Sequence, residues 1–341
     1  MQTPRRFRPL ELAAFLAVVA LSLPLVAGFL GGLHPALDAF SHFRAHLAVL
    51  VLLLGLALVF GAFRREGVVA VAFGAAALFT VTGLAGLPGL SRVHAAFQPR
   101  DEVVPIYRLL QFNLRYDNRE VDKVLALIGS LRPDIVTLQE AEGPIRRKLA
   151  VLDETYRYKA SCRGTDVVIL SLRPFANGSG PTCVERTSYA AASIDLAGRT
   201  VDIAALHLHW PWPFGQSRDV ERLREPLAAL GPDAMVAGDF NAVPWSATVR
   251  TMEAAAGATR VDGDGATWML RRLPDALRPL GLPIDHVLTK GDIVVHSART
   301  LGPAGSDHLP VLVEFSLKPL DAPAGEKETS AGVAPQPAVA G

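Results

Sequence analysis

AMVAGDFNAVPWS, residues 234–246, decides how the second half of this chain folds. Its opening residues, 234–237, are small and apolar, which is typical of a short strand buried on both faces. Asp239 and Asn241 follow at the point where that strand ends. A carboxylate and an amide at the end of a buried strand indicate a polar site at the edge of a sheet.

The same arrangement recurs along residues 105–317. A single Asp or His at a strand end is most simply a turn former or a satisfied surface group. Six such places in chain order indicate instead that several strand ends converge on one polar cleft. They are Asn113 after LLQF, Glu140 after DIVTLQ, His207 after DIAAL, Asp239 with Asn241 after AMVAG, Asp285 with His286 in PIDHVL, and Ser306, Asp307 and His308 in GSDHLP.

The apolar pattern predicts an α/β fold. Apolar runs at residues 106–112 and 135–138 flank a helical pattern at residues 121–128, so the domain is expected to open with strand, helix and strand. Many strands and few helices predict two sheets packed together and covered by helices. Further strands are predicted at residues 167–170, 191–196, 201–206, 234–237, 285–288, 293–296 and 311–315, with helices around residues 220–230 and 247–256.

Taken in order, these motifs resemble those of the endonuclease/exonuclease/phosphatase family, also called the DNase I-like family. QFNLRYDN is similar to its first motif, LQEAE to its metal-binding glutamate motif and ALHLHW to its histidine motif. GDFNAVPWS, ATWM followed by PIDHVL, and GSDHLPVLVEF are similar to its GDFN, Thr-Trp with Asp-His, and SDH motifs. The resemblance implies a four-layer α/β/β/α sandwich with the cleft at one sheet edge.

The resemblance also implies a divalent metal. Glu140 would be the principal Mg²⁺ (or Mn²⁺) ligand, with Asn113 beside it and Asp307 as a further ligand. Oxygen donors suit Mg²⁺, which keeps several waters and also binds substrate phosphate.

The catalytic roles implied by the resemblance belong to metal-dependent hydrolysis of a phosphate ester. Asp239 would orient or deprotonate the attacking water, and Asn241 would hold a phosphoryl oxygen. His308, polarised by Asp285 or Asp307, would act as general acid or base. His207 would stabilise the charged transition state.

The first 95 residues predict a membrane anchor. Only eleven charged residues fall within residues 1–100, and they lie between apolar runs at residues 12–33, 47–63 and 67–90. Each run is near the ~20 residues needed to cross a bilayer as a helix. Three transmembrane helices are therefore expected, the third run being rich in Gly and Ala.

The basic residues predict the orientation of this anchor. Arg5, Arg6 and Arg8 precede the first run, and Arg64 with Arg65 separates the second from the third. The positive-inside rule puts both groups on the cytoplasmic face, so a multi-pass protein of the cytoplasmic (inner) membrane with an extracytoplasmic catalytic domain is expected. A cleaved signal peptide is the alternative for the first run, although no convincing small-x-small cleavage site precedes His34.

The remaining composition bounds the catalytic domain, residues 101–318. Residues 101–320 hold 25 Lys plus Arg and 27 Asp plus Glu, so this part lacks the basic balance of a dedicated nucleic-acid binder. Residues 319–341 are rich in Pro, Ala and Gly without an aromatic residue, which predicts a disordered tail. Cys162 and Cys183 allow either a disulfide in an oxidising compartment or two buried thiols.

Three functions remain open on these observations. Three spans before such a domain resemble a membrane-anchored bacterial type of the family, which includes proteins linked to glycopeptide resistance, so a lipid-linked phosphate of envelope synthesis is a candidate substrate and membrane lipids are candidate partners. An extracytoplasmic nuclease, using basic runs at residues 146–148 and 271–272, is the enzymatic alternative. A non-catalytic membrane-bound binding domain is the third.

Trp210, Trp212 and Phe214 lie in a proline-rich loop after the histidine motif. These aromatic side chains either pack within the loop or touch lipid.

Overall fold

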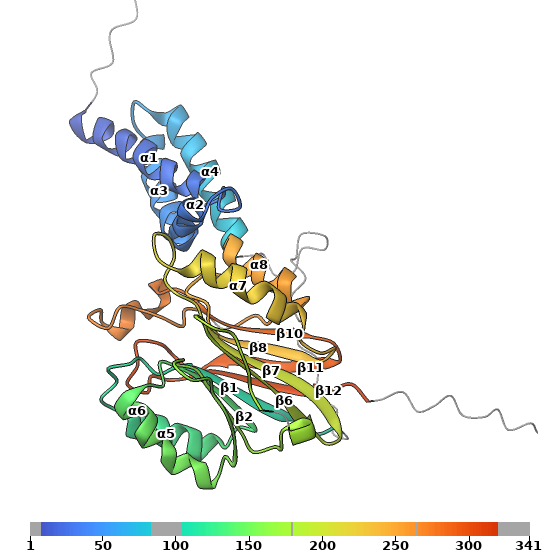
Figure 1. The fold of residues 1–341 in the computed structure, drawn as a ribbon. Coiled ribbons are helices and arrows are strands. Elements are labelled where there is room, and N and C mark those ends of the chain that lie inside the picture. Colours follow the sequence, from blue (N-terminus) through green and yellow to red (C-terminus); the bar gives the residue numbers. More distant parts are fainter. Residues whose placement is uncertain (1–7, 83–103, 179, 264, 320–341) are drawn as a thin grey trace, which may run out of the picture.

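The computed structural model describes residues 8–82, 104–178, 180–263 and 265–319, and Figure 1 draws its elements. A bundle of N-terminal helices stands on one end of a two-sheet domain. The helices are α1 (Pro9–Ala27), α2 (Pro35–Ala39), η1 (Phe40–Phe43), α3 (Arg44–Val59), α4 (Arg64–Thr82), α5 (Val121–Leu131), α6 (Gly143–Leu149), η2 (Ala150–Glu154), η3 (Ala176–Gly178), α7 (Gln216–Ala228), α8 (Ala247–Ala256) and η4 (Asp275–Leu280).

Twelve strands in the described chain form two six-stranded sheets. The first sheet has the order β11-β12-β1-β2-β4-β3, and the second has the order β5-β6-β7-β8-β10-β9. Each sheet contains one parallel pair, β1 with β2 and β7 with β8, among antiparallel neighbours. The strands are β1 (Tyr107–Asn113), β2 (Ile135–Gln139), β3 (Tyr158–Ala160), β4 (Val168–Ser171), β5 (Thr182–Cys183), β6 (Ser188–Leu196), β7 (Arg199–His207), β8 (Ala234–Asp239), β9 (Thr259–Arg260), β10 (Asp285–Lys290), β11 (Ile293–Thr300) and β12 (Val311–Leu317).

Three apolar clusters define four layers. Side chains of both sheets, among them Leu109 and Ile203, form the central cluster between the sheets. Val124 and Ile128 of α5 pack on the outer face of the first sheet, and Leu223 of α7 with other residues of α7 and α8 covers the second. The predicted α/β/β/α sandwich is therefore confirmed.

Short strands at the sheet edges are the elements that the apolar pattern missed. β5 and β9 have two residues each and β3 has three. Two or three residues carry no periodicity, so these strands exist only because a longer neighbour offers them a hydrogen-bonding edge.

The prediction of three transmembrane helices is corrected to two candidate membrane spans in the described chain. By length and composition alone, two helical segments of the described chain qualify as candidate membrane spans, Pro9–Ala27 and Pro35–Val59. The third predicted run, residues 67–90, contributes helix α4, which packs against α3 but begins with Arg64, Arg65 and Glu66. Residues 83–90 lie outside the described residues.

Of two further sequence predictions, the structure answers the question of cysteine pairing and does not describe the predicted tail. Cys162 and Cys183 form a disulfide, which joins the segment after β3 in the first sheet to β5 in the second. This resolves the choice between paired and free cysteines. The predicted tail lies outside the described residues from position 320 onward.

Candidate active site

Strand register brings the predicted site residues to one end of the sandwich. In the first sheet Asn113 lies opposite Gln139, and Glu140 follows directly. In the second sheet Asp239 lies opposite His207 on one side and Asp285 on the other. The two sheets are packed face to face, so the ends of β1, β2, β7 and β8 and the start of β10 meet.

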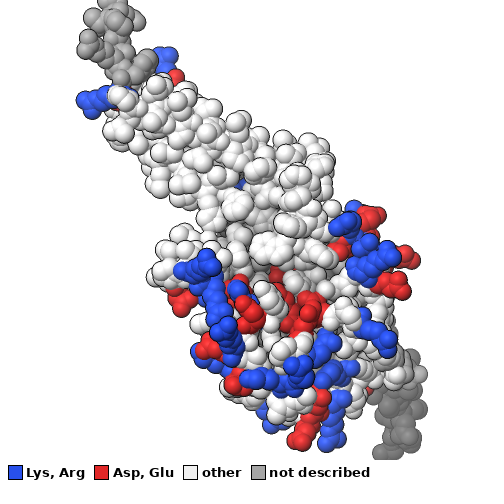
Figure 2. All heavy atoms as spheres, turned by 60° about the vertical axis from the view of Figure 1, so that its left-hand side comes forward, with Lys and Arg blue, Asp and Glu red and all other residues white. Residues whose placement is uncertain are grey.

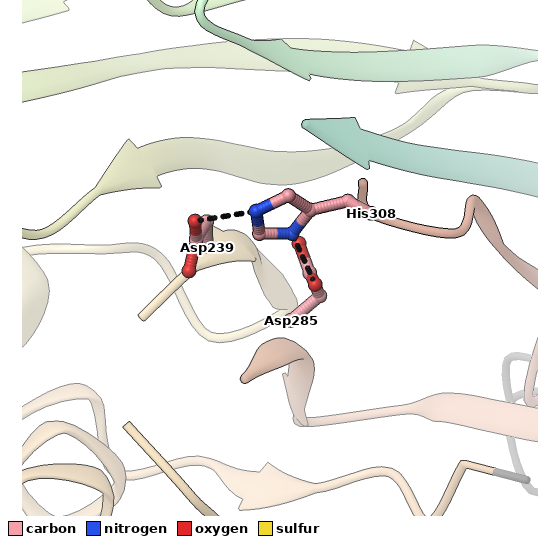
Figure 3. Close-up of side chains that lie close together, drawn as sticks. All are labelled: Asp239, Asp285 and His308. Atoms are coloured by element: carbon pink, nitrogen blue, oxygen red, sulfur yellow. Dashed lines mark hydrogen bonds and ion pairs between the residues drawn. The ribbon is translucent and has the colours of Figure 1, made fainter. Parts of the chain in front are cut away.

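Asp239, Asp285 and His308 form the centre of the site (Figure 3). Nδ1 of His308 lies 2.8 Å from Oδ2 of Asp285, and Nε2 of the same ring points to Oδ2 of Asp239 at 3.6 Å. All three side chains are buried. The imidazole thus has one nitrogen held by a carboxylate and the other directed at a second carboxylate, the arrangement of a proton-transfer group with a fixed orientation.

His207 makes the same arrangement on the other side of Asp239. Its Nδ1 lies 2.5 Å from Oδ2 of Asp166, and its Nε2 lies 3.7 Å from Oδ2 of Asp239. Asp166 was not predicted as a site residue. The only signal for it in the sequence is its position directly before the predicted strand at residues 167–170.

These contacts shift the pKa values of the site. Burial opposes the charged form of His308, but Asp285 and Asp239 outweigh burial and raise the pKa of His308 to about 9. Burial likewise opposes a charged His207, yet its hydrogen bond to Asp166 and the charge of Asp239 raise its pKa to about 9. Both imidazoles are therefore positively charged at neutral pH.

The two central carboxylates, Asp239 and Asp285, have pKa values shifted in opposite directions. Burial, with a further contribution from Asp285, raises the pKa of Asp239 to about 6 although His308 and His207 act against it. Burial also acts to raise the pKa of Asp285, but the charge and hydrogen bond of His308 hold it below its usual value. Asp239 is accordingly the carboxylate able to exchange a proton near neutral pH.

Asn113 and Glu140 lie where a divalent cation was predicted. Nδ2 of Asn113 donates to Oε1 of Glu140 at 3.0 Å and to Oδ2 of Asp239 at 2.9 Å, so one amide bridges two carboxylates. Glu140 remains partly exposed. The carboxylate of Glu140 and the amide oxygen of Asn113 are oxygen donors of the kind that suits Mg²⁺ or Mn²⁺, so these residues fit the predicted metal. Asp239, Asp285 and His308 form a further group, with ligand atoms within 4.8 Å of one another, that could hold a metal.

Asp307 is held differently from the other predicted ligands. Its Oδ2 accepts from Nη1 of Arg115 at 2.7 Å and from Nε1 of Trp268 at 3.2 Å. The carboxylate that polarises His308 is therefore Asp285 and not Asp307, which resolves that alternative. The role of Asp307 as a metal ligand stays a prediction.

Left-handed backbone marks two of the predicted residues. Glu140 has φ of 54° and Asn241 has φ of 45°, values that few residues other than glycine adopt. The amide nitrogen of Asn241 donates to Oδ1 of Asp239 at 2.7 Å, and its Nδ2 donates to the Leu208 carbonyl at 2.8 Å. Such strain is retained where the surrounding structure holds it, and it concentrates at functional sites.

Supporting residues complete the site. Oγ1 of Thr267 accepts from the backbone nitrogen of Asp285 at 3.1 Å. Oγ of Ser306 donates to the Asn113 carbonyl at 2.8 Å. Gln111, which was not predicted, donates to Oδ1 of Asp285 at 3.0 Å. Its place within the apolar run before Asn113 is the signal that could have revealed it.

A buried carboxylate between two imidazoles that are each held by a second carboxylate, beside further oxygen donors, is the arrangement expected of a metal-dependent phosphoester hydrolase. The endonuclease/exonuclease/phosphatase family model matches residues 110–308, more than half of the chain. The chain belongs to that family, whose members are metal-dependent phosphoester hydrolases. By sequence, no match was found among curated proteins.

Solved structures share the fold. D. rerio TDP2 complexed with single strand DNA product is 18% identical with a TM-score of 0.51, covering 62% of this chain and 99% of its own. Sphingomyelinase C from Streptomyces griseocarneus is 17% identical with a TM-score of 0.46, covering 62% and 99%. Beta toxin from Staphylococcus aureus, a mutant with bound magnesium ions, is 14% identical with a TM-score of 0.49, covering 63% and 100%.

Proposed function

We propose that the chain is a membrane-anchored, Mg²⁺-dependent phosphoesterase that hydrolyses lipid-linked phosphate esters at the outer face of the cytoplasmic membrane. The observation that carries the hydrolytic part is the position of Asp239 between His207 and His308, 3.7 Å and 3.6 Å from their Nε2 atoms. Each imidazole is backed by a second carboxylate. This supplies a proton acceptor and two positively charged donors around one point.

In the proposed reaction Asp239 takes a proton from the attacking water as the new P–O bond forms. His308 gives the proton on Nε2 to the leaving oxygen, while Asp285 stabilises the charged ring. His207, charged through Asp166, donates to a phosphoryl oxygen as negative charge develops there. A Mg²⁺ ion held by Glu140 and Asn113 would supply positive charge against the phosphoryl oxygens.

Location in a membrane is supported by the N-terminal helices. Figure 2 shows a white shaft, free of Lys, Arg, Asp and Glu over most of the visible face, between a charged tip and the charged catalytic domain. The turn between α3 and α4 lies beside the start of α1, because a Cβ on Gly61 would sit 3.0 Å from Oε1 of Glu11. Arg64 and Arg65 therefore share that end of the bundle with Arg8.

An outward-facing catalytic domain, for which α4 would cross the bilayer beside α3 and α1, is supported by charge and by the disulfide. The basic end of the bundle is opposite the end that meets the catalytic domain, and basic residues favour the cytoplasmic side. The Cys162–Cys183 bond also fits an oxidising compartment outside the cytoplasm.

A lipid-linked substrate is supported by exposed apolar side chains beside the site, which we call the apolar rim. Trp210 packs edge-on against Trp268, which itself donates to Asp307. The carbonyl of Leu280 lies 2.7 Å from Nε2 of His46 in α3, so the rim continues directly from the helical bundle. Its side chains are between 39% and 64% exposed: Trp210, Trp212, Phe214, Leu270, Leu273, Leu277 and Leu280.

Two residues of the basic run at residues 146–148, which favoured a nuclease, have partners within the catalytic domain. Arg146 donates to the carbonyls of Ala141 and Thr165, each at 2.8 Å, and Lys148 lies 3.3 Å from Asp122. Figure 2 shows acidic and basic side chains interspersed over the visible face of the catalytic domain. A tracking surface for nucleic acid would instead be continuously basic.

The proposal is tested with the full-length protein in lipid nanodiscs. Aryl phosphate mono- and diesters are titrated with Mg²⁺ and Mn²⁺ after chelation, and lipid-linked phosphates in the same discs are compared with single- and double-stranded DNA. Metal-dependent turnover that is fastest on the lipid esters is expected. DNA cleavage exceeding lipid hydrolysis would establish the nuclease instead, and no turnover at any metal concentration would indicate a binding domain.

A further inference from the structure

The segment from α2 to the start of α3, which is the first part of the second candidate span, carries buried polar side chains that the phosphoesterase site does not use. Asp38, Ser41, His42 and Arg44 are each no more than 6% exposed, although they lie in a short segment between apolar helices. A buried polar group without a partner is costly, so the partners of these side chains show what the segment is built to hold.

Asp38 holds the start of helix α8 in the catalytic domain. Its Oδ1 accepts from the backbone nitrogen of Ala247 at 2.7 Å, and its Oδ2 accepts from that of Thr248 at 2.9 Å. Both amides belong to the first turn of α8, where backbone N–H groups lack partners within the helix and where negative charge is favourable. Ser246 supplies the cap from within the catalytic domain, so Asp38 adds a second, external set of acceptors.

His42 reaches the predicted active-site asparagine. Its Nε2 lies 3.1 Å from the carbonyl oxygen of Asn241. A carbonyl only accepts, so the tautomer with a hydrogen on Nε2 donates to it. From the catalytic domain, Gln216 donates to the same oxygen at 2.7 Å.

The peptide that His42 holds is connected to the reacting groups. Asn241 has left-handed φ, and its own N–H donates to Oδ1 of Asp239 at 2.7 Å. That N–H belongs to the Phe240–Asn241 peptide, and the carbonyl held by His42 belongs to the adjoining Asn241–Ala242 peptide. A change in the backbone angles of Asn241 would therefore alter the hydrogen bond to Asp239. The His42 ring contacts the carbonyl oxygens of Ala39 and Asn241, so it acts on Asp239 through Asn241.

The anchor also contacts residues 243–245, which follow the GDFN motif. Nε1 of Trp245 donates to the Ser41 carbonyl at 2.7 Å. Val243, Trp245 and Ile284 form an apolar cluster against which Ala45 of α3 and Val81 of α4 pack. The anchor therefore contacts the loop that follows β8 through charge, hydrogen bonds and apolar packing.

We propose that residues 35–46 are an integral part of the active site, in which Asp38 and His42 are positioning residues that fix the Asn241 peptide and the start of α8. The catalytic domain consequently depends on its membrane anchor for geometry as well as for location. The inference uses the proposed hydrolysis as one readout, but it concerns structure and can be tested separately from it.

The test compares His42→Ala, His42→Gln and Asp38→Asn in the full-length protein in nanodiscs. A soluble aryl phosphodiester gives kcat and KM, and hydrogen exchange follows the amides of residues 240–249. For His42→Ala we expect kcat to fall about tenfold or more with KM nearly unchanged, since an orienting contact and not substrate binding is lost. His42→Gln should restore most of kcat, because its side-chain amide can donate to the Asn241 carbonyl.

Hydrogen exchange provides the reading that does not need an active enzyme. Amides of residues 240–249 should exchange at least about tenfold faster in His42→Ala and Asp38→Asn, as expected when local structure is destabilised. His34→Ala is the matched control, since His34 is exposed directly before α2 and accepts from the backbone nitrogen of Ala36 within the anchor.

The outcomes separate the two proposals. If wild-type protein hydrolyses no phosphoester but the variants exchange faster at residues 240–249, the proposed function fails and the anchoring inference stands. Unchanged exchange together with unchanged kcat in the His42 and Asp38 variants would overturn the inference. Should Asp38→Asn not fold, Gly31→Ala provides a second test, because its Cβ would meet Oδ1 of Asp38 at 2.3 Å.

Discussion

The surroundings of Asp239 shift its pKa in opposite directions. Burial and Asp285 favour its protonated form, whereas His207 and His308 favour the carboxylate. Asn113 and the Asn241 amide also donate to it. A side chain under such balanced control is suited to taking up and releasing a proton in each cycle.

The first prediction concerns removal of this proton acceptor. Asp239→Asn should lower kcat by about 10² to 10⁴ fold, the range for loss of a general base, while the fold is retained. His308→Ala should have a similar effect, and Glu140→Gln should raise the Mg²⁺ concentration needed for half-maximal rate. Rates are measured on a soluble phosphodiester, with Asp122→Asn, whose side chain is 81% exposed, as the control. Normal rates in all three variants would refute the site assignment.

The second prediction is a bell-shaped dependence of kcat/KM on pH. The rate should rise as pH increases through about 6, where Asp239 loses its proton, and fall above about 9, where His207 and His308 lose theirs. A bound divalent cation shifts the lower limb to lower pH, because positive charge favours the carboxylate. In Asp166→Asn the upper limb should move to lower pH, since His207 loses the partner that raises its pKa. An upper limb that does not move would exclude His207 from the titration.

At the scale of elements, the disulfide is a link between the two sheets. It closes a sequence separation of 21 residues and joins edge segments that have few ladder hydrogen bonds of their own. A covalent link of this kind restricts the unfolded chain.

Replacing both cysteines, Cys162→Ser with Cys183→Ser, should therefore lower the free energy of unfolding by about 3 kcal/mol. Denaturant unfolding with and without a reducing agent measures this. Reduced wild-type protein should resemble the double variant, whose own midpoint should not respond to the reductant. Equal midpoints for oxidised wild type and double variant would show that the link adds no stability.

The apolar rim gives a prediction about presentation of the substrate. Trp212→Ser with Phe214→Ser should reduce hydrolysis of lipid phosphoesters in nanodiscs by about tenfold or more, because each aromatic side chain loses apolar burial worth about 1.5–3 kcal/mol. Hydrolysis of a soluble phosphodiester should stay within about twofold of the wild-type rate, a difference much smaller than the tenfold loss expected on lipid phosphoesters. Equal losses on both substrates would mean that the loop supports the site and does not touch lipid. Leu33→Ser, 77% exposed in the connection after α1, is a matched apolar control.

Several elements follow from local pattern and others do not. The strands over Tyr107–Asn113 and Ala234–Asp239 and the helix over Ala247–Ala256 were predictable, since each has an unbroken apolar run or helical spacing. β9, Thr259–Arg260, was not, because two residues become a strand only when β10 lies alongside.

At the scale of the whole molecule, the helical bundle packs directly against the sandwich. Asp38 and His42 on the anchor meet the segment after β8, and α7 and α8 lie at the end of the sandwich nearest the bundle in Figure 1. In the proposed arrangement the site residues therefore lie close to the level at which the helices would leave the bilayer.

The last prediction concerns orientation in the membrane. A reporter domain that is active only outside the cytoplasm should be active when fused after residue 319 and inactive when fused after residue 62, since basic residues keep the α3–α4 turn on the cytoplasmic side. Activities are normalised to the amount of each fusion protein in the membrane. The reverse pattern would place the catalytic domain in the cytoplasm.

Sequence alone determined the two-sheet class, the family and most of the acids, amides and histidines of the site, because these depend on local apolar periodicity and on residue types at strand ends. The pairing of Asp285 with His308, the contribution of Asp166 and the bond between Cys162 and Cys183 were decided only by the tertiary structure. So were the contacts of Asp38 and His42, which lie about 200 residues from their partners in the chain. Such contacts depend on sheet register and on the docking of a separate bundle, and neither leaves a periodic trace in the residues that make them.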